Sequence, residues 1–402
     1  MQSFLTRTKT FLTPNGSSAN LRANAGFRTE KSATALFAPT DPLIDGEDCL
    51  HDCASCVETL PRKWEIDEED ELYGHVKGWQ THLIVATGKR DWVRDVTDEN
   101  GSLMQAVGKV GLELKNGQVM LSASDLPTGH HSTSHVHKEK DYPDDGQTRC
   151  LVLPRWDWVE GVGMGEARWL LEEVVAKGAT NASPLNDSTS ESKQAMQEGG
   201  DKQELMVQRE DGGAEEVSNV NELTIQEKQQ SNGKQDGSTT DDTLDVRKPS
   251  ISPSYAPKPA GVTIKPCQHR AIILMCSHGT RDWRCGKSAP LLRREFERHL
   301  RPLGLYRDFG DERPGGVGVY FINHVGGHKY SANVMVYRRE GQKKEGGSDE
   351  LRDEAVQGIW LARVRPEDCE NIVKYTVLQG KLVKPQRQLR GGFDRERGVI
   401  SW

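Results

Sequence analysis

The C-terminal third of the chain alternates short apolar runs with stretches of helical periodicity. Four runs have the length and composition of buried β-strands, and they lie at residues 271–275, 317–322, 332–337 and 358–364. A helix is predicted from Ala289 to Leu300, where apolar residues recur at helical spacing. A second helix is predicted after the last strand, because Pro366 suits a first helical turn and Gly380 suits a helix end. This order of elements predicts an α/β domain with a thioredoxin-like core.

A long polar stretch interrupts this pattern. Residues 178–261 contain a single aromatic residue, Tyr255, and neither cysteine nor histidine. Such a composition cannot bury enough apolar surface to offset the entropy lost on ordering, so we predict a disordered linker here. The low share of hydrophobic residues, 35% of the 402, agrees with this. The linker separates a predicted N-terminal domain at 41–177 from a C-terminal domain at 262–385, which a tail at 386–402 follows.

The two predicted domains share a short sequence pattern. Without a gap, residues 83–94 align with residues 274–285 and match a leucine, a glycine and an Arg-Asp-Trp triplet. In this register Val85 and Arg94 stand where the second copy has two cysteines. We therefore expect an α/β protein of two thioredoxin-like domains joined by the disordered linker, in which the N-terminal domain is a degenerate copy.

Charge and hydropathy bear on the partners and the cellular location of the protein. The net charge of -7 and the lack of a basic stripe give no electrostatic reason to expect nucleic-acid binding. No apolar run reaches the roughly 20 residues that a membrane-spanning helix needs. The first 29 residues carry four basic side chains and no acidic one, in a chain whose acids outnumber its bases. This is typical of a mitochondrial presequence, so residues 1–40 are predicted to be a presequence or a disordered tail.

Candidate metal ligands lie in the loops of the predicted C-terminal domain. Cys276 and Cys285 are separated by eight residues and come directly after the first strand. His324 and His328 lie between the second and third strands, with two glycines between them that give this loop backbone freedom. Two thiolates and two imidazoles can complete a four-ligand site. The sequence therefore predicts that these four residues bind a metal.

Other chemistry is compatible with some of the cysteines. A Cys2His2 zinc site stays open, although the paired cysteines of zinc fingers are usually about two to four residues apart. A thiol–disulfide oxidoreductase would need C-x-x-C directly after a strand, which Cys276 and Cys285 do not provide. Cys53 and Cys56 have that spacing but follow no predicted strand. A thiol switch, a second metal site and plain reduced thiols therefore remain open for these two residues and for Cys49.

Four segments together resemble the sucrase/ferredoxin-like family. They are CSHGTRDWRCGKSAPLL at 276–292, HVGGHKYSANVMVY at 324–337, GIWLARVRPEDC at 358–369 and, more weakly, WQTHLIVATGKRDW at 79–92. These segments cover the folded parts of the chain and leave out the linker. Members of this family are thioredoxin-like ferredoxins that carry a [2Fe-2S] cluster on two cysteines and two histidines.

Carried over to this chain, the resemblance makes Cys276 and Cys285 the ligands of one iron and His324 and His328 the ligands of the other. It implies one-electron transfer, which can be coupled to a proton, or redox sensing, and it favours an electron carrier over an enzyme. Neutral imidazole ligands are expected to raise the reduction potential, as in Rieske centres. The alternative is a redox-regulated interaction protein with a structural cluster or a Cys2His2 zinc site. The sequence does not identify the redox partner protein.

Two signals for the cellular compartment disagree. The predicted presequence and the mitochondrial members of the family favour the mitochondrial matrix. The residues Ile400, Ser401 and Trp402 resemble the tail by which an assembly machinery recognises some cytosolic iron–sulfur proteins, and an exposed tryptophan there would suit a partner. We expect the matrix, with the cytosol as the alternative and the iron–sulfur assembly machinery as a candidate partner of the tail.

Overall fold

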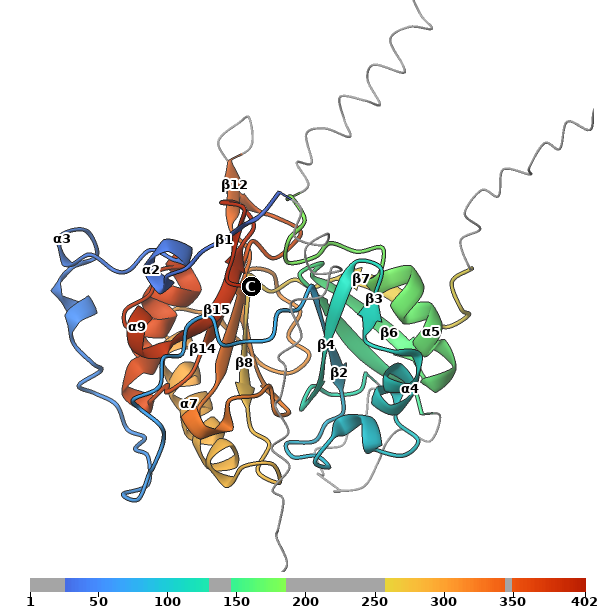
Figure 1. The fold of residues 1–402 in the computed structure, drawn as a ribbon, viewed down its shortest axis with the longest axis horizontal. Helices are drawn as coiled ribbons and strands as arrows, with labels where there is room; N and C mark the ends of the chain where they lie inside the picture. Colours follow the sequence, from blue (N-terminus) through green and yellow to red (C-terminus); the bar gives the residue numbers. More distant parts are fainter. Residues whose placement is uncertain (1–25, 130–145, 186–256, 344–348) are drawn as a thin grey trace, which may run out of the picture. The chain divides into compact units, whose positions relative to one another are not determined.

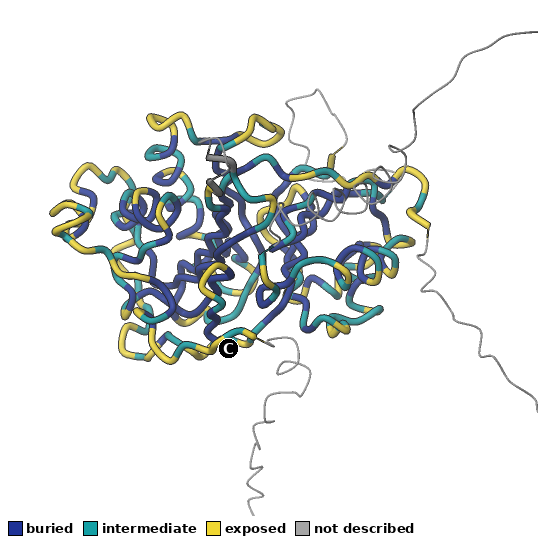
Figure 2. Tube along the Cα trace, turned by 90° about the horizontal axis from the view of Figure 1, so that it is seen from above, coloured by how far each residue is buried: buried dark blue, intermediate teal, exposed yellow. Residues whose placement is uncertain are grey.

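One mixed β-sheet organises the part of the chain that the structure describes. The computed structural model describes residues 26–129, 146–185, 257–343 and 349–402, which belong to one structural unit (Figure 1). Fourteen described strands form the sheet, and β12 (Gly341–Lys343) pairs separately with β13 (Asp349–Leu351). Buried stretches of the backbone run through the strands, whereas the surrounding loops are more exposed (Figure 2). None of the described helices has the length and apolar character needed to cross a bilayer.

The first half of the sheet is built from residues 81–185 together with one strand from beyond the linker. Its main strands are β2 (Thr81–Ala86), β4 (Gly117–Ser124), β5 (Thr148–Leu153) and β6 (Asp157–Val162). They lie in the order β4–β2–β5–β6, with β2 parallel to β4 and the other neighbours antiparallel. The remaining elements are α4 (Leu103–Val110) between β2 and β4, α5 (Ala167–Trp169) with its π-helical continuation (Leu170–Val175) after β6, and the short edge strands β3 (Glu113–Leu114) and β7 (Thr263–Pro266).

The second half of the sheet is built from residues 271–402. Its main strands are β8 (Ala271–Cys276), β10 (Val317–Ile322), β11 (Val334–Arg338) and β14 (Gln357–Leu361). They lie in the order β10–β8–β11–β14, with β10 parallel to β8 and the other neighbours antiparallel. The remaining elements are α7 (Trp283–Leu300), β9 (Tyr306–Arg307), the helical stretch 366–377 with α8 (Cys369–Asn371), α9 (Pro385–Gln388), β15 (Leu389–Asp394) and β16 (Val399–Ile400). The four predicted strands are confirmed with ends that differ by a few residues.

The two halves share one strand order and meet through equivalent edge strands. β4 and β10, each parallel to the first strand of its half, pair with each other in antiparallel fashion. The hydrogen bonds at this junction are reciprocal. The N–H of Asn323 donates to the carbonyl oxygen of Ala123, and the N–H of Ala123 donates to the side-chain oxygen of Asn323, both at 3.0 Å. In the same way, the N–H of Asp125 donates to the carbonyl oxygen of Phe321 at 3.3 Å, and the N–H of Phe321 donates to the carboxylate of Asp125 at 2.8 Å. Such an exchange of equivalent bonds is what a local twofold relation between the halves produces.

The pattern of apolar residues in the strands follows from burial on both faces. In β8, Ile273 and Met275 pack in a cluster with apolar residues of α7, whereas Ile272 and Leu274 pack in a second cluster that also contains Ile84 of the first half. A third cluster packs the strands of the first half against α4 and α5. A strand that is buried on both faces reads as a continuous apolar run, and β8 is such a run. The helices accordingly lie beside the strands of their own half (Figure 1).

The helix α7 begins six residues before the predicted start. Its N-cap is Asp282, whose side chain accepts a hydrogen bond from the backbone N–H of Arg284 at 2.9 Å. The apolar periodicity that predicted the helix begins only at Ala289, because the preceding turn is mostly polar. The earlier start places Cys285 in the first helical turn.

Residues 26–76 pack along the second half of the sheet and correct two predicted boundaries. β1 (Arg28–Thr29) pairs with β16, and the short helix α2 (Ala33–Leu36) buries Leu36 and Phe37 in the cluster under α7. The described residues 26–40 are therefore part of the fold and not a tail; residues 1–25 lie outside the described residues. α3 (Pro42–Asp45) and the stretch that follows also run beside the second half, so residues 41–76 do not join the first half as predicted (Figure 1).

The predicted tail at 386–402 is also part of the sheet. β15 pairs with β14, and β16 pairs with β15. Ile400 is fully buried and Ser401 is 6% exposed, while Trp402 stacks on Trp79 with ring centroids 4.4 Å apart. The expectation of an exposed recognition tail is therefore wrong for this conformation, because apolar side chains in β15 and β16 complete the core.

The predicted linker at 178–261 lies mostly outside the described residues, and its disorder stays a prediction. Its described start is anchored to the first half. Asn181 is fully buried, and its Nδ2 donates to the carbonyl oxygen of Trp79 at 3.0 Å. The packed part of the first half therefore extends a few residues beyond Gly178.

Candidate metal centre

The two cysteines of the predicted site are brought together by one strand and one helix. Cys276 is the last residue of β8, and its N–H donates to the carbonyl oxygen of Asn333 at 3.1 Å. Cys285 lies in the first turn of α7, which Asp282 caps. Both cysteines are buried, with 1% and 0% of their surface exposed. The turn between strand and helix thus directs two thiols into one buried space.

The two histidines come from the loop that follows β10. His324 is two residues past the end of this strand, and His328 opens a short 3-10 turn (His328–Tyr330). Between them, Gly326 and Gly327 adopt positive φ angles of 89° and 68°, which residues other than glycine rarely adopt. At Gly327 a Cβ would also collide with the guanidinium of Arg390. The predicted use of these glycines in folding the loop is consistent with both observations.

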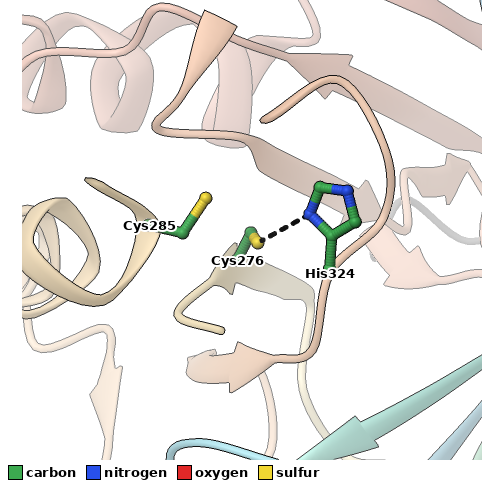
Figure 3. A group of neighbouring side chains, drawn as sticks. All are labelled: Cys276, Cys285 and His324. Atoms are coloured by element: carbon green, nitrogen blue, oxygen red, sulfur yellow. Dashed lines mark hydrogen bonds between the residues drawn. The ribbon is translucent and has the colours of Figure 1, made fainter. Parts of the chain in front are cut away.

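Three of the four predicted ligands converge (Figure 3). The Sγ atom of Cys276 lies 3.9 Å from Nδ1 of His324, and these two atoms and Sγ of Cys285 all lie within 4.8 Å of one another. His328 is outside this group and is exposed, although its ring centroid is 5.4 Å from that of His324. The geometry therefore supplies three convergent ligand atoms and a second imidazole beside them.

The two thiols do not ionise independently. A hydrogen bond from the Cys285 thiol, together with the neighbouring His324 ring, holds the pKa of Cys276 well below its usual range despite burial. The same contact with Cys276, together with burial, raises the pKa of Cys285. One thiolate is thus favoured in the metal-free protein, and a bound cation would favour the second.

His278 lies between the cysteines in sequence but is not available as a ligand. Its Nδ1 accepts the N–H of His324 at 3.2 Å, and its Nε2 donates to the carbonyl oxygen of Trp92 at 2.9 Å. This assignment of the ring proton follows from the two partners, since a backbone N–H only donates and a carbonyl only accepts. Because both ring nitrogens are used, His278 orients the backbone of His324 and links it to the first half.

A buried cation lies beside the site, and no sequence pattern pointed to it. Arg390 is 5% exposed, donates to the carbonyl oxygen of Gly326 at 3.0 Å and to Oδ1 of Asn333 at 2.9 Å, and lies over the Trp360 ring. Burial lowers its pKa to about 10, which the nearby Tyr330 and Cys276 oppose. By contrast Arg284, which is close to Cys285 in sequence, pairs with Asp282. The charge that faces the thiols therefore comes from β15.

A cavity of about 410 Å³ opens onto His324. Its wall combines residues of the first half, such as Met120 of β4, with the glycine loop of the second half. Lys77, Arg390 and two tryptophans also line it, Trp79 and Trp360. The cavity gives a route from the surface to the imidazole side of the site.

The equivalent place in the first half carries no ligands. At the junction Ile322 of β10 pairs with Ser124 of β4, so these two residues occupy equivalent positions. Within its own half, Ile322 pairs with Cys276 of β8, and Ser124 pairs with Ala86 of β2. Ala86 therefore takes the place of Cys276, one residue from the Val85 that the gap-free alignment predicted. By the same register Leu126 takes the place of His324. Arg94 is exposed in a non-helical loop.

The remaining cysteines form no disulfide. All eight cysteines of the chain lie in the described residues and are free. Cys49 and Cys53 are buried, and Cys53 lies close to His299 and Glu370 in a second group of candidate ligand atoms. The segment that contains Cys53 and Cys56 thus packs against the second half, near His299 in the last turn of α7 and remote from Cys285 in its first turn.

Comparison with known proteins decides the family. A sequence model described as sucrase/ferredoxin-like matches residues 72–391, which include the main strands of both halves and all four candidate ligands. The chain belongs to the sucrase/ferredoxin-like family. Membership confirms the resemblance on which the ligand assignment depends, while no solved structure matches the chain significantly.

Relatives in this family match a limited part of the chain. Actin patches distal protein 1 of Saccharomyces cerevisiae is 41% identical over 111 residues, which are 28% of this chain and 31% of that protein. Altered inheritance of mitochondria protein 32 is 34% identical over 130 residues in Meyerozyma guilliermondii, covering 32% of this chain and 35% of that protein. In Clavispora lusitaniae it is 33% identical over 116 residues, covering 29% and 33%. The match thus spans about a third of each relative.

Proposed function

We propose that the second half of the sheet is a thioredoxin-like ferredoxin domain that holds a [2Fe-2S] cluster and transfers single electrons. Cys276 and Cys285 would bind one iron, and His324 and His328 the other. The observation that supports this is the convergence of two buried thiols with the first imidazole from a loop 48 residues away, with the second imidazole at its side. A Cys2His2 donor set is one that Rieske-type clusters use.

The strand order supports the thioredoxin-like assignment for both halves. In each half a strand–helix–strand unit with parallel strands is followed by two antiparallel strands and a helix. The reciprocal bonds at the β4–β10 junction support an internal repeat. The first half, with Ala86 and Leu126 at the ligand places, would be the degenerate copy.

When bound, such a cluster supplies one-electron chemistry at a potential raised by its neutral imidazole ligands. The chain's own residues prepare the place for it. Burial of Cys276 and Cys285 keeps water from the thiolates. Arg390 places a positive charge where reduction would add a negative one, and its Coulomb energy is large because it is 5% exposed. An imidazole that opens onto the cavity could exchange a proton with solvent, which would couple the potential to pH.

A single zinc ion is the second candidate for this site. The observation that favours it is the close grouping of the three ligand atoms of Cys276, Cys285 and His324, which would suit one tetrahedral ion. In that case the site would be structural, and the protein would be a redox-regulated interaction protein and not an electron carrier.

The proposed compartment is the mitochondrion, with its matrix as the specific expectation and the cytosol as the alternative. The printed name of several relatives, altered inheritance of mitochondria protein 32, supports a mitochondrial role. A presequence would have to end before Arg28, because β1 is part of the sheet. Recognition of Ile400, Ser401 and Trp402 by an assembly machinery would have to act before β16 is paired.

The test is the visible spectrum of the protein purified without oxygen, together with its iron, sulfide and zinc contents. The expected wild type is brown, with two irons and two sulfides per chain, and Cys276→Ser removes both. Cys267→Ala is the matched control, since Cys267 is fully buried but outside the group. A colourless wild type with zinc would replace the ferredoxin assignment by the zinc site, and a colourless wild type without metal would overturn both.

A further inference from the structure

We propose that Cys53, His299 and Glu370 form a second metal site that takes a zinc-class divalent cation. Their ligand atoms lie within 4.8 Å of one another, although the three residues come from three separate segments. Sγ of Cys53 and Nε2 of His299 are already 3.8 Å apart. Ligand atoms of a tetrahedral zinc ion are roughly 3.5 Å apart at the usual bond lengths, so Cys53 and His299 are already close to the separation that such an ion needs.

The three ligands lie at the end of α7 remote from Cys285. Cys285 is in the first turn of this helix and His299 in the last, which at the rise of an α-helix separates them by about 21 Å. The second site therefore cannot share an ion with the proposed cluster. Its existence is independent of the proposed function.

A cationic group of the protein already lies among these ligand atoms. One terminal nitrogen of Arg298, Nη2, is 3.6 Å from Sγ of Cys53, 3.0 Å from Nε2 of His299 and 2.7 Å from Oε2 of Glu295. Because a guanidinium can only donate, the sulfur and the imidazole nitrogen must both present lone pairs to it. A lone pair on sulfur and another on imidazole nitrogen are what a zinc-class ion requires.

The cysteine segment is held in place without help from a metal. The N–H of Cys53 donates to the carbonyl oxygen of Glu367 at 3.0 Å. Oε1 of the buried Glu295 accepts the N–H groups of both Val57 and Glu58 at 2.9 Å. Asn371 donates to the carbonyl oxygen of His51 at 2.8 Å. The ligands are thus positioned by their surroundings, as in sites that bind a metal after folding.

Three protein ligands leave a fourth position open. Cys56 lies three residues after Cys53, which is the C-x-x-C spacing common in zinc sites, and its thiol now donates to the carbonyl oxygen of Glu58 at 3.2 Å. Either this thiol after a rotation or a water molecule can complete the site. A bound ion would tie residues 46–58 to α7 and to the helical stretch 366–377, and would stabilise the folded chain by linkage.

The experiment uses the full chain with Cys276→Ser and His324→Ala, so that the first site cannot bind. The probes are Zn²⁺, counted per chain after dialysis, and Co²⁺, whose sulfur-to-metal charge-transfer band reports a bound thiolate. We expect one zinc ion per chain and a cobalt–thiolate band. Cys53→Ser should lower the intensity of the band and lower zinc affinity at least tenfold, Glu370→Gln should lower zinc affinity by a similar factor, and Cys267→Ala should change neither.

Two further variants sharpen this test. Arg298→Gln should raise zinc affinity, because it removes the cation that competes for Cys53 and His299. Cys56→Ser should weaken the charge-transfer band if Cys56 is the fourth ligand and leave it unchanged if water is. Absence of zinc from the background protein, or equal zinc binding after Cys53→Ser, overturns the proposal. If Cys53→Ser does not fold, Glu370→Gln decides, because Glu370 is only partly buried.

Discussion

The two halves of the sheet repeat one arrangement of strands and use it differently. In the second half, the end of β8 and the loop after β10 carry Cys276 and His324, which converge. At the equivalent places the first half has Ala86 and Leu126, both fully or almost fully buried. The same geometry therefore gathers candidate ligands in one half and apolar core residues in the other. What the arrangement provides is a buried meeting point of two loops, and the side chains decide its chemistry.

The largest expected difference between the halves comes from substituting alanine at the equivalent positions His324 and Leu126. We expect His324→Ala to remove all cluster-bound iron but, relative to the wild type without its cluster, to change stability little, because His324 is only partly buried. Leu126→Ala should leave the iron content unchanged but lower the free energy of unfolding by about 2–5 kcal/mol, the usual cost of a cavity. Iron analysis and urea unfolding of both variants test this. Iron loss in Leu126→Ala with the fold intact would contradict the comparison.

The junction between the halves gives the next largest effect. Asp125 accepts the N–H of Phe321 and pairs with Arg293 at 2.8 Å; the side chain of Asp125 is buried and that of Arg293 partly buried. We expect Asp125→Ala to lower the free energy of unfolding by about 1–3 kcal/mol, because the buried N–H of Phe321 loses its acceptor, whereas Arg293 keeps its pair with Glu297. Asp125→Asn, which copies the Asn323 of the other half, keeps the acceptor for Phe321 and should lose less. Because both variants remove the ion pair, equal losses in urea unfolding would mean that the hydrogen bond to Phe321 contributes nothing.

A buried histidine of the first half makes stability depend on pH. His82 stands where the second half has Ile272, and it bonds to Ser122 and Tyr337. Burial lowers the pKa of His82 to about 3, below the unfolded value of 6.5, so its contribution is present above pH 6.5 and is lost as the pH falls. We expect a loss of about 2 kcal/mol between pH 7 and pH 5. His82→Gln, which cannot titrate, should flatten the pH dependence of urea unfolding; an unchanged slope would assign it to other groups.

The smallest expected effect concerns the contact between Trp402, which follows β16, and Trp79, which precedes β2. Trp402 stacks on Trp79, and a stacked aromatic pair contributes about 0.5–1.5 kcal/mol beyond the area it buries. Trp402→Ala should therefore lower the free energy of unfolding by about 1–2 kcal/mol, while Trp402→Phe should restore part of it. Thermal unfolding measures both. No change in either variant would indicate that Trp402 is free of this contact in solution, as a recognition tail requires.

The fold of the second half could be predicted because its strands are apolar on both faces, so that β8 and β10 stand out against polar neighbours. The start of α7 could not be predicted, since it depends on one N-cap hydrogen bond that the side chain of Asp282 accepts. The strands after residue 386 were missed because Gly391 and Gly392 weaken a strand signal. Both glycines are required there by close neighbours, the side chain of Ser401 and the backbone of Gly358.

The candidate ligands were predicted from their residue types and from family resemblance, and the structure brings Cys276, Cys285 and His324 together. Arg390 was missed because it comes from a strand 66 residues beyond His324, and nothing in the local sequence relates them. The docking of Leu36 and Phe37 on the second half was missed for the same physical reason. A short apolar stretch of an N-terminal segment does not reveal which distant surface it will cover.

The pairing of β1 with β16 also has a consequence for the order of events on the ribosome. Arg28 and Thr29 leave the ribosome early, yet their strand partners at residues 399 and 400 are about 370 residues further on. At a synthesis rate of about 5–20 residues per second this is a delay of roughly 20 to 70 seconds. During that interval Leu36 and Phe37 lack the surface that buries them, so chaperones have access to an N-terminal segment that has not yet packed on the second half. In a chain closed this late, the first strand of the sheet has no partner until synthesis is almost complete.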